Sequence, residues 1–137
     1  MDKRELLTLV KEQANLNDSD AQRVARAVLL TLRSQLSRIE VIDIDETLPT
    51  DIDSLWHGGW LQMLMTSLQS LRDLDKDEFV EQVRESADLR TKQEAEDIIR
   101  TVFHALKIAI PYQEVEHITN DLADDLADDL QNMWKAA

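Results

Sequence analysis

The chain has 137 residues, with 15 Lys and Arg against 28 Asp and Glu, so its formal net charge is −13. It contains no Cys, which excludes disulfides, thiolate nucleophiles and metal sites built on sulfur. Two Gly are too few for the turns of a β-sandwich or barrel, so we predict an all-α fold.

The N-terminal segment carries the start signals of two helices. Asp2 caps the first helix, and Glu5 three residues later completes a capping box. The second helix is the more apolar of the two, and we predict that it begins at Ser19 with Gln22 as its capping-box partner. Because of its apolar face, this helix is expected to lie in the core.

The next segment predicts a third helix and a short fourth one. Ser37 is the expected N-cap of the third helix, with Glu40 as its capping-box partner. The β-branched residues between 39 and 44 favour a strand locally. We still predict a helix, because a lone strand would have no partner elsewhere in the chain. Pro49 then begins a short helix that ends at Trp56.

Two stretches of the chain are similar to each other, which indicates an internal repeat. Residues 2–16 align with residues 75–89, and seven of these fifteen pairs are identical. After a one-residue insertion the pairs are Ala21 and Ala95, Arg26 and Arg100, Val28 and Val102, Leu32 and Leu106, Glu40 and Glu114, Val41 and Val115, and Ile44 and Ile118. A second gap pairs Leu48 with Leu126, Ile52 with Leu130, Leu55 with Met133, and Trp56 with Trp134.

The helices of the second copy are predicted from this alignment. Asp75 and Thr91 are the expected caps of its first two helices, and Pro111 is expected in the first turn of the third. Apolar residues at a spacing of four from Leu122 to Trp134 predict that the chain stays helical there.

The repeat defines the expected organisation of the chain. The glycine pair at 58–59 follows the end of the first copy, and the apolar segment after it has no counterpart beyond Trp134. We therefore predict a single helical domain, 1–137, with unit one at 1–56, a connector helix at 57–74 and unit two at 75–137.

The chain resembles the bacterial domain-of-unknown-function family numbered 2267, and the resemblance covers both units. The run Arg26–Arg33 matches the family's Arg-Ala-Val-Leu-x-x-Leu-Arg in the second helix. Residues 48–60 are similar to its Leu-Pro, aromatic and Gly-Trp run, although Gly58 stands where the family often has an acidic residue. The resemblance implies an all-helical fold and transfers neither a catalytic residue nor a cofactor.

Four side chains form a candidate metal site between the two units. Glu114 and His117 are three residues apart, so they share a helix face, and Glu40 and Asp43 repeat this spacing in unit one. Helical bundles hold metal ions with such Glu-x-x-His pairs and further Glu residues. The alternative interpretation is that all four lie on solvated outer faces, with the Glu residues serving as capping-box partners.

The three histidines do not suggest catalysis. His57, His104 and His117 are scattered, and no Ser stands at nucleophile–base spacing from them. His104 aligns with Leu30, so it is expected at the core or its boundary. We therefore predict that the protein is not an enzyme.

An acidic run near the C-terminus is a candidate docking face for a basic partner. Asp124, Asp125, Asp128 and Asp129 recur every four residues opposite a row of leucines. The alternative is that these residues form the acidic outer face of an amphipathic helix.

An aromatic and methionine cluster beside the glycine pair is a second candidate interaction site. Trp56, Trp60 and Met63 are residue types that favour protein interfaces. The alternative is that they fill the gap between the two units.

The predicted function is that of a non-enzymatic bacterial protein-interaction or structural module, and the alternative is a metal- or small-ligand-binding helical protein. The acidity disfavours nucleic acid and anionic membranes, because both attract Lys and Arg, and it favours a partner with a basic surface. Apolar runs are far shorter than the roughly 18 residues of a membrane span, so a cytoplasmic location is expected. The sequence leaves the oligomeric state open.

Overall fold

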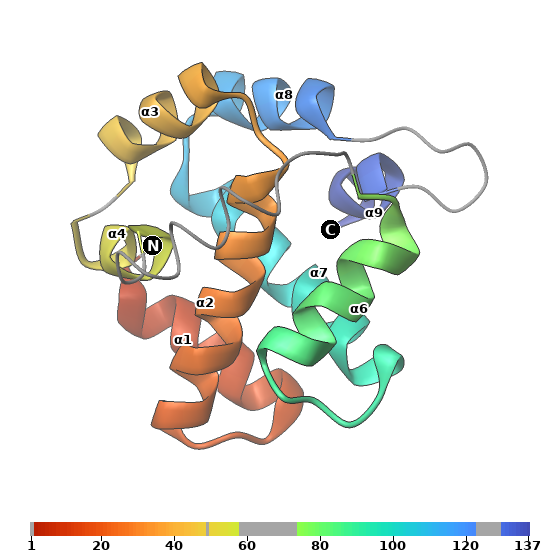
Figure 1. Cartoon of the computed structure of the whole chain (residues 1–137). Coiled ribbons are helices and arrows are strands. Elements are labelled where there is room, and N and C mark those ends of the chain that lie inside the picture. The colour runs from red at the N-terminus through yellow and green to blue at the C-terminus, as the bar shows by residue number, and fades with distance from the viewer. Residues whose placement is uncertain (1, 49, 58–73, 123–129) are drawn as a thin grey trace.

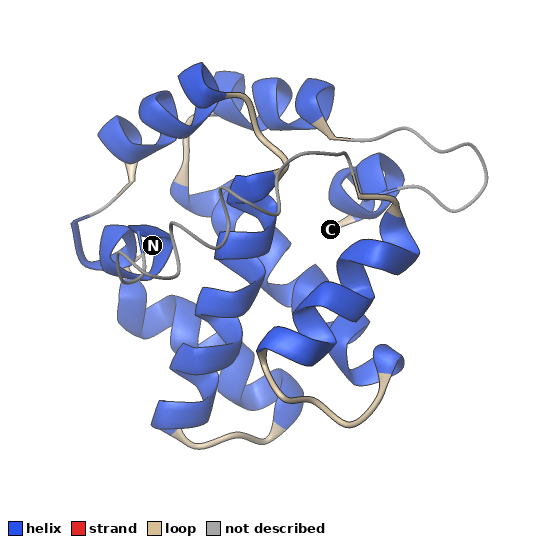
Figure 2. Ribbon diagram, viewed as in Figure 1, coloured by secondary structure: helices blue, strands red, loops and turns tan. Residues whose placement is uncertain are grey.

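The computed structural model describes residues 2–48, 50–57, 74–122 and 130–137, and these residues form helices and no strand. The predicted all-α fold is therefore confirmed for the described part of the chain (Figure 2). The helices are α1 (Lys3–Ala14), α2 (Asp18–Ser34), α3 (Arg38–Thr47), α4 (Thr50–His57), α6 (Lys76–Ser86), α7 (Lys92–Ala109), α8 (Tyr112–Asp121) and α9 (Leu130–Ala136). None of these helices is both long enough and apolar enough to cross a membrane.

The helices pack around one hydrophobic core to which every one of them contributes. Figure 1 shows α1, α2, α6 and α7 in the lower body of the molecule, with α3 and α8 as a layer above them. The long helices α2 and α7 carry many of the buried residues, as expected from their apolar sequences. α7 packs against both α1 and α6, so it joins the first part of the chain to the second.

Most of the predicted helix caps are present, with two shifts. Asp2 and Thr91 accept from the backbone N–H three residues on, as predicted. The prediction of Ser19 as the cap of α2 is wrong, because Asn17 takes this role and its side chain accepts from the N–H of Asp20. Pro111 is the residue before α8 rather than part of its first turn. The residues that precede these helices adopt extended backbone conformations, which let the chain enter a helix. They are Asp2, Asn17, Thr91 and Pro111.

The start of α6 has the complete capping box that the sequence predicts. The Asp75 side chain accepts from the N–H of Glu78, and the Glu78 side chain accepts from the N–H of Asp75. The Asp75→Ala variant is expected to lose about 1 kcal/mol of unfolding free energy, measured by urea denaturation. The exposed residue Glu85 on the same helix is the matched control, since Glu85→Ala removes no cap. Equal losses in the two variants would contradict this role of Asp75.

α3 is a helix despite its β-branched residues, because the Ser37 side chain caps its first turn and Ile44 is fully buried.

The helices α3 and α8 end in the same way. Leu48 follows α3 and Leu122 follows α8, both in an extended conformation, and each donates its N–H to the carbonyl four residues earlier. Leu48 and Leu122 thus occupy matching positions after their helices, whereas Leu126, with which the sequence pairs Leu48, lies outside the described residues. The predicted helix from Leu122 to Trp134 is confirmed only in its last part, α9, because Leu122 itself is extended and residues 123–129 lie outside the described residues.

The C-terminal helix α9 packs on α7 through aromatic side chains. Phe103 contacts Trp134 edge-on, with ring centroids 5.1 Å apart. The Trp134 indole N–H donates to the hydroxyl of Thr119 on α8 at 2.9 Å. Lys107 lies over the same indole and donates to the carbonyl oxygens of Trp134, Lys135 and Ala137. A positive charge at a helix C-terminus is favourable, so α7 holds the end of α9 in place.

Candidate metal centre

The candidate centre lies between α3 and α8, which run antiparallel as neighbours (Figure 1). The backbone N–H of Ser37, at the start of α3, donates to the Asp121 carboxylate at the end of α8 at 3.0 Å. One turn further along α3, Glu40 meets His117. Each helix carries two of the candidate ligands three residues apart. The pair Glu40 and Asp43 on α3 therefore faces the pair Glu114 and His117 on α8.

The two glutamates occupy equivalent positions in their helices. Each is the third residue of its helix, and the residue four positions later, Ile44 or Ile118, is fully buried. Both Glu40 and Glu114 are only 4% exposed. The interpretation that they lie on solvated outer faces is therefore wrong, and the two carboxylates are buried between the helices.

One ligand atom from each of Glu40, Asp43, Glu114 and His117 can be chosen so that all four atoms lie within 4.8 Å of one another. Nδ1 of His117 lies 3.2 Å from Oε2 of Glu40 and 3.7 Å from Oε2 of Glu114. The His117 side chain is 51% exposed, so one edge of the cluster opens to solvent. The structure thus brings together the four residues that the sequence proposed as metal ligands.

The electrostatic environment of Glu40 is unfavourable for an isolated negative charge. Burial is the main cause that raises the pKa of Glu40, and it acts together with the hydrogen bond to Glu114 and the charges of Glu114, Asp121 and Asp43, so that the pKa is about 8. Oε1 of Glu40 and Oε2 of Glu114 are buried and have no hydrogen-bond partner in the part of the chain that the structure describes. A proton or a cation between the two carboxylates would relieve this repulsion.

The donor set fits one small transition-metal ion. Three carboxylates and one imidazole suit Mn²⁺, Fe²⁺ or Zn²⁺. Ligand atoms on opposite sides of such an ion lie about 4.2 Å apart, since each bond is about 2.1 Å long. The four atoms all lie within 4.8 Å of one another, which is close to this spacing. The exposed edge of His117 would give an ion access to the cluster from solvent.

The sequence missed one acidic neighbour of this cluster. Asp121 binds the N–H of Ser37 and also raises the pKa of Glu40. Its position, seven residues after Glu114, places it two turns further along the same face of α8. That spacing was the signal by which it could have been found.

The other candidate interaction residues do not form a described surface site. Trp56 is fully buried in the core, so it does not serve as an exposed anchor. Trp60 and Met63, as well as Asp124, Asp125, Asp128 and Asp129, lie outside the described residues.

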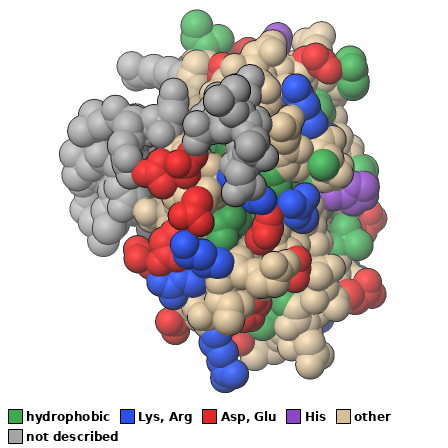
Figure 3. All heavy atoms as spheres, turned by 90° about the vertical axis from the view of Figure 1, so that its right-hand side faces the viewer, with side chains coloured by type: hydrophobic (Ala, Val, Ile, Leu, Met, Phe, Trp, Pro, Cys, Tyr) green, Lys and Arg blue, Asp and Glu red, His purple; other side chains and the backbone are tan. Residues whose placement is uncertain are grey.

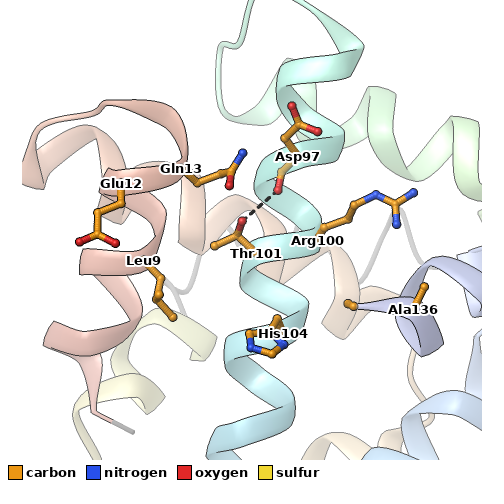
Figure 4. Close-up of a pocket in the computed structure, with 9 residues that line it drawn as sticks. Leu9, Glu12, Gln13, Asp97, Arg100, Thr101, His104 and Ala136 are labelled. Carbon is orange, nitrogen blue, oxygen red and sulfur yellow. Dashed lines mark hydrogen bonds between the residues drawn. The ribbon is translucent and has the colours of Figure 1, made fainter.

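A groove runs over α7 between α1 and the C-terminal end of α9 (Figure 4). Its cavity volume is about 540 Å³, within the range of small-molecule pockets. His104 is exposed in this groove, so the prediction that it belongs to the core or its boundary is wrong. Arg100 points toward α9, and the Thr101 hydroxyl donates to the backbone carbonyl of Asp97 at 3.1 Å. The lining residues are Leu9, Glu12, Gln13, Asp97, Arg100, Thr101, His104, Ala136 and Ala137.

The face drawn in Figure 3 mixes acidic and basic side chains. Ion pairs join α6 to α7 through Lys76 and Glu96 at 2.8 Å, and through Lys92 and Asp77 at 3.2 Å. Arg100 adds a second contact to Glu96 at 3.1 Å, and Lys76 and Arg100 hold the pKa of that carboxyl below its ordinary value. Several acidic side chains of α6 and α7 are therefore paired with basic ones.

The fold and the cluster define an all-helical protein with a candidate cation site between two antiparallel helices. The chain matches the model of the family described as "Uncharacterized conserved protein (DUF2267)" over residues 3–135, and it belongs to this family. The resemblance stated from the sequence is thereby confirmed. No curated protein matches the chain.

Proposed function

We propose that this protein binds one transition-metal ion, such as Mn²⁺, Fe²⁺ or Zn²⁺, between α3 and α8. The convergence of Glu40, Asp43, Glu114 and His117 supports the proposal most directly. An acidic cluster alone would be weak support, but here two carboxylates are buried and each has an oxygen without a hydrogen-bond partner among the described residues. Groups of this kind are costly unless a proton or a cation neutralises them.

Metal binding is tested by calorimetry and by thermal unfolding in the presence of Mn²⁺, Fe²⁺ or Zn²⁺. An ion at 100 times its Kd is expected to raise the unfolding free energy by about 2.7 kcal/mol, and the melting temperature by several degrees. The double variant Glu40→Gln, Glu114→Gln is expected to lose this response. It removes two anionic ligands while side-chain size is nearly kept.

The matched control is the double variant Glu46→Gln, Glu116→Gln, which neutralises exposed glutamates on the same two helices. It should keep the response to the ion, because neither residue belongs to the cluster. A flat response of the unaltered chain to all three ions would refute the proposal. An equal loss in the control variant would show that the ions bind the acidic surface diffusely.

We also propose that the fold arose from two related units joined by a connector, 1–56, 57–74 and 75–137. Matched local features support this arrangement. Asn15 and Asp88, aligned in the sequence, are the non-glycine residues with positive φ in the described part, at 54° and 57°. Glu40 and Glu114 face each other across the α3–α8 pair, and Trp56 and Trp134 are both fully buried. The connector itself lies almost wholly outside the described residues.

A non-enzymatic role in protein interaction, in the bacterial cytoplasm, stays a prediction. Its best described support is the outer face of α3, where Ile39 is 74% exposed and Ile42 is 50% exposed. Apolar residues of this size at the surface are typical of contact sites when they are grouped. Ile39→Ser and Ile42→Ser should leave the unfolding free energy within about 0.5 kcal/mol, as is usual at the surface. A larger loss would indicate that these residues stabilise the fold itself.

A further inference from the structure

The docking of α3 depends mainly on α8 among the helices that the structure describes. The inner face of α3 is apolar, with Ile44 fully buried and Leu48 nearly so. The two helices form the upper layer of the molecule in Figure 1, away from the contacts among α1, α6 and α7. α3 is therefore a peripheral element whose departure would leave the packing of those three helices in place.

The side of α3 that faces α8 is held by polar groups. Glu40 is buried against Glu114 and His117, and Asp43 belongs to the same cluster. Three of these four groups are carboxylates, so their mutual repulsion opposes the docking when they are ionised. The backbone N–H of Ser37 also donates to the Asp121 carboxylate at the edge of the α3–α8 pair. This contact places another carboxylate near the cluster.

A divalent ion reverses the sign of these interactions. Each carboxylate then attracts the ion, and ligands from α3 and α8 are joined through one centre. Local opening of an element can occur at a lower free energy than global unfolding, particularly at the periphery of a fold. An ion that needs ligands from both helices is lost when they separate, so its binding free energy opposes that opening.

We infer that the bound ion acts as a clamp, which holds α3 on α8 and whose loss lets α3 open from the core while α6 and α7 remain folded. The inference rests on the proposed metal binding and adds the regulation of that site. Occupancy of the site then determines how often the inner face of α3, including Ile44, is exposed.

The absence of Cys in the chain permits a direct test with a single introduced thiol. Ile44→Cys places the thiol on the inner face of α3, and Val102→Cys places one in α7 as the matched control, both at fully buried positions. The rate of reaction with a disulfide reagent reports how often each position opens. In a chelator, the I44C thiol is expected to react at least about tenfold faster than the V102C thiol.

Mn²⁺ at 100 times its Kd is expected to slow the reaction of I44C about 100-fold, because opening then requires loss of the ion. The same addition should leave the rate unchanged when I44C is combined with Glu40→Gln and Glu114→Gln. If I44C does not fold, hydrogen exchange of the α3 and α7 amides in the unaltered chain gives the same comparison.

Equal rates for I44C and V102C in the chelator would overturn the clamp, since α3 would then open only with the whole molecule. An unchanged I44C rate while calorimetry shows Mn²⁺ bound would also overturn it, and would leave the proposed metal binding intact. An absence of Mn²⁺, Fe²⁺ and Zn²⁺ binding to the unaltered chain would overturn both.

Discussion

Replacing Phe103 with alanine is expected to lower the free energy of unfolding by about 3–5 kcal/mol. Phe103 is fully buried in α7, and its ring makes edge-on contacts with Phe79 at 5.7 Å and Trp134 at 5.1 Å. The side chain thus joins α6, α7 and α9, and its loss leaves a cavity between three helices. Urea denaturation of the variant gives the change directly.

The adjacent residue on the same helix is the control for this prediction. His104 is exposed, so His104→Ala should change the unfolding free energy by no more than about 0.5 kcal/mol. A loss below about 1 kcal/mol for Phe103→Ala would show that the contacts among the three rings contribute little.

The metal-free protein is expected to lose stability as the pH rises from about 4.5 to about 8, because of Glu40. The pKa of this carboxyl is raised from 4.5 to about 8, chiefly by burial and then by Glu114. Between about pH 4.5 and pH 8 the Glu40 carboxyl is protonated in the folded state and ionised in the unfolded state. The free energy of unfolding therefore falls as the pH rises through this range. One such proton changes the unfolding free energy by at most about 1.4 kcal/mol per pH unit.

Glu40→Gln removes this titration. Unfolding free energies in a chelator, measured from pH 5 to pH 9, should fall less steeply for the variant than for the unaltered chain. The difference between the two should change by more than about 1 kcal/mol over this range. Glu46→Gln, at an exposed position of the same helix, should follow the unaltered chain. Parallel curves for Glu40→Gln and the unaltered chain would contradict the assignment to Glu40.

Local features of the fold were predictable because they depend on short stretches of sequence. The caps Asp75 and Thr91 follow from a polar side chain three residues before an acidic one. The start of α2 was misplaced because Asn17 and Ser19 are both good caps, and the path of the preceding turn decides between them. The end of α8 was missed because Leu122 fits a spacing of four equally well whether or not the helix continues.

The membership of the candidate site was predictable, whereas its environment was not. The repeat and the i, i+3 spacing together pointed to Glu40, Asp43, Glu114 and His117. Their burial follows from the close antiparallel approach of α3 and α8, which no local pattern encodes. A capping-box position and a buried ligand position look alike in the sequence, because both place a Glu three residues after the cap.

The two halves of the candidate site differ at one position, and this difference sets the charge of the ligand set. Asp43 and His117 are equivalent under the repeat, so one unit supplies an anion where the other supplies a neutral imidazole. With both glutamates ionised, the set carries three negative charges and leaves one in excess over a divalent ion. His117→Asp would leave two in excess and Asp43→His would leave none. Under the proposed metal binding, a substitution at this one pair of positions would change the charge left at the site, and with it the oxidation state of the ion that the site favours.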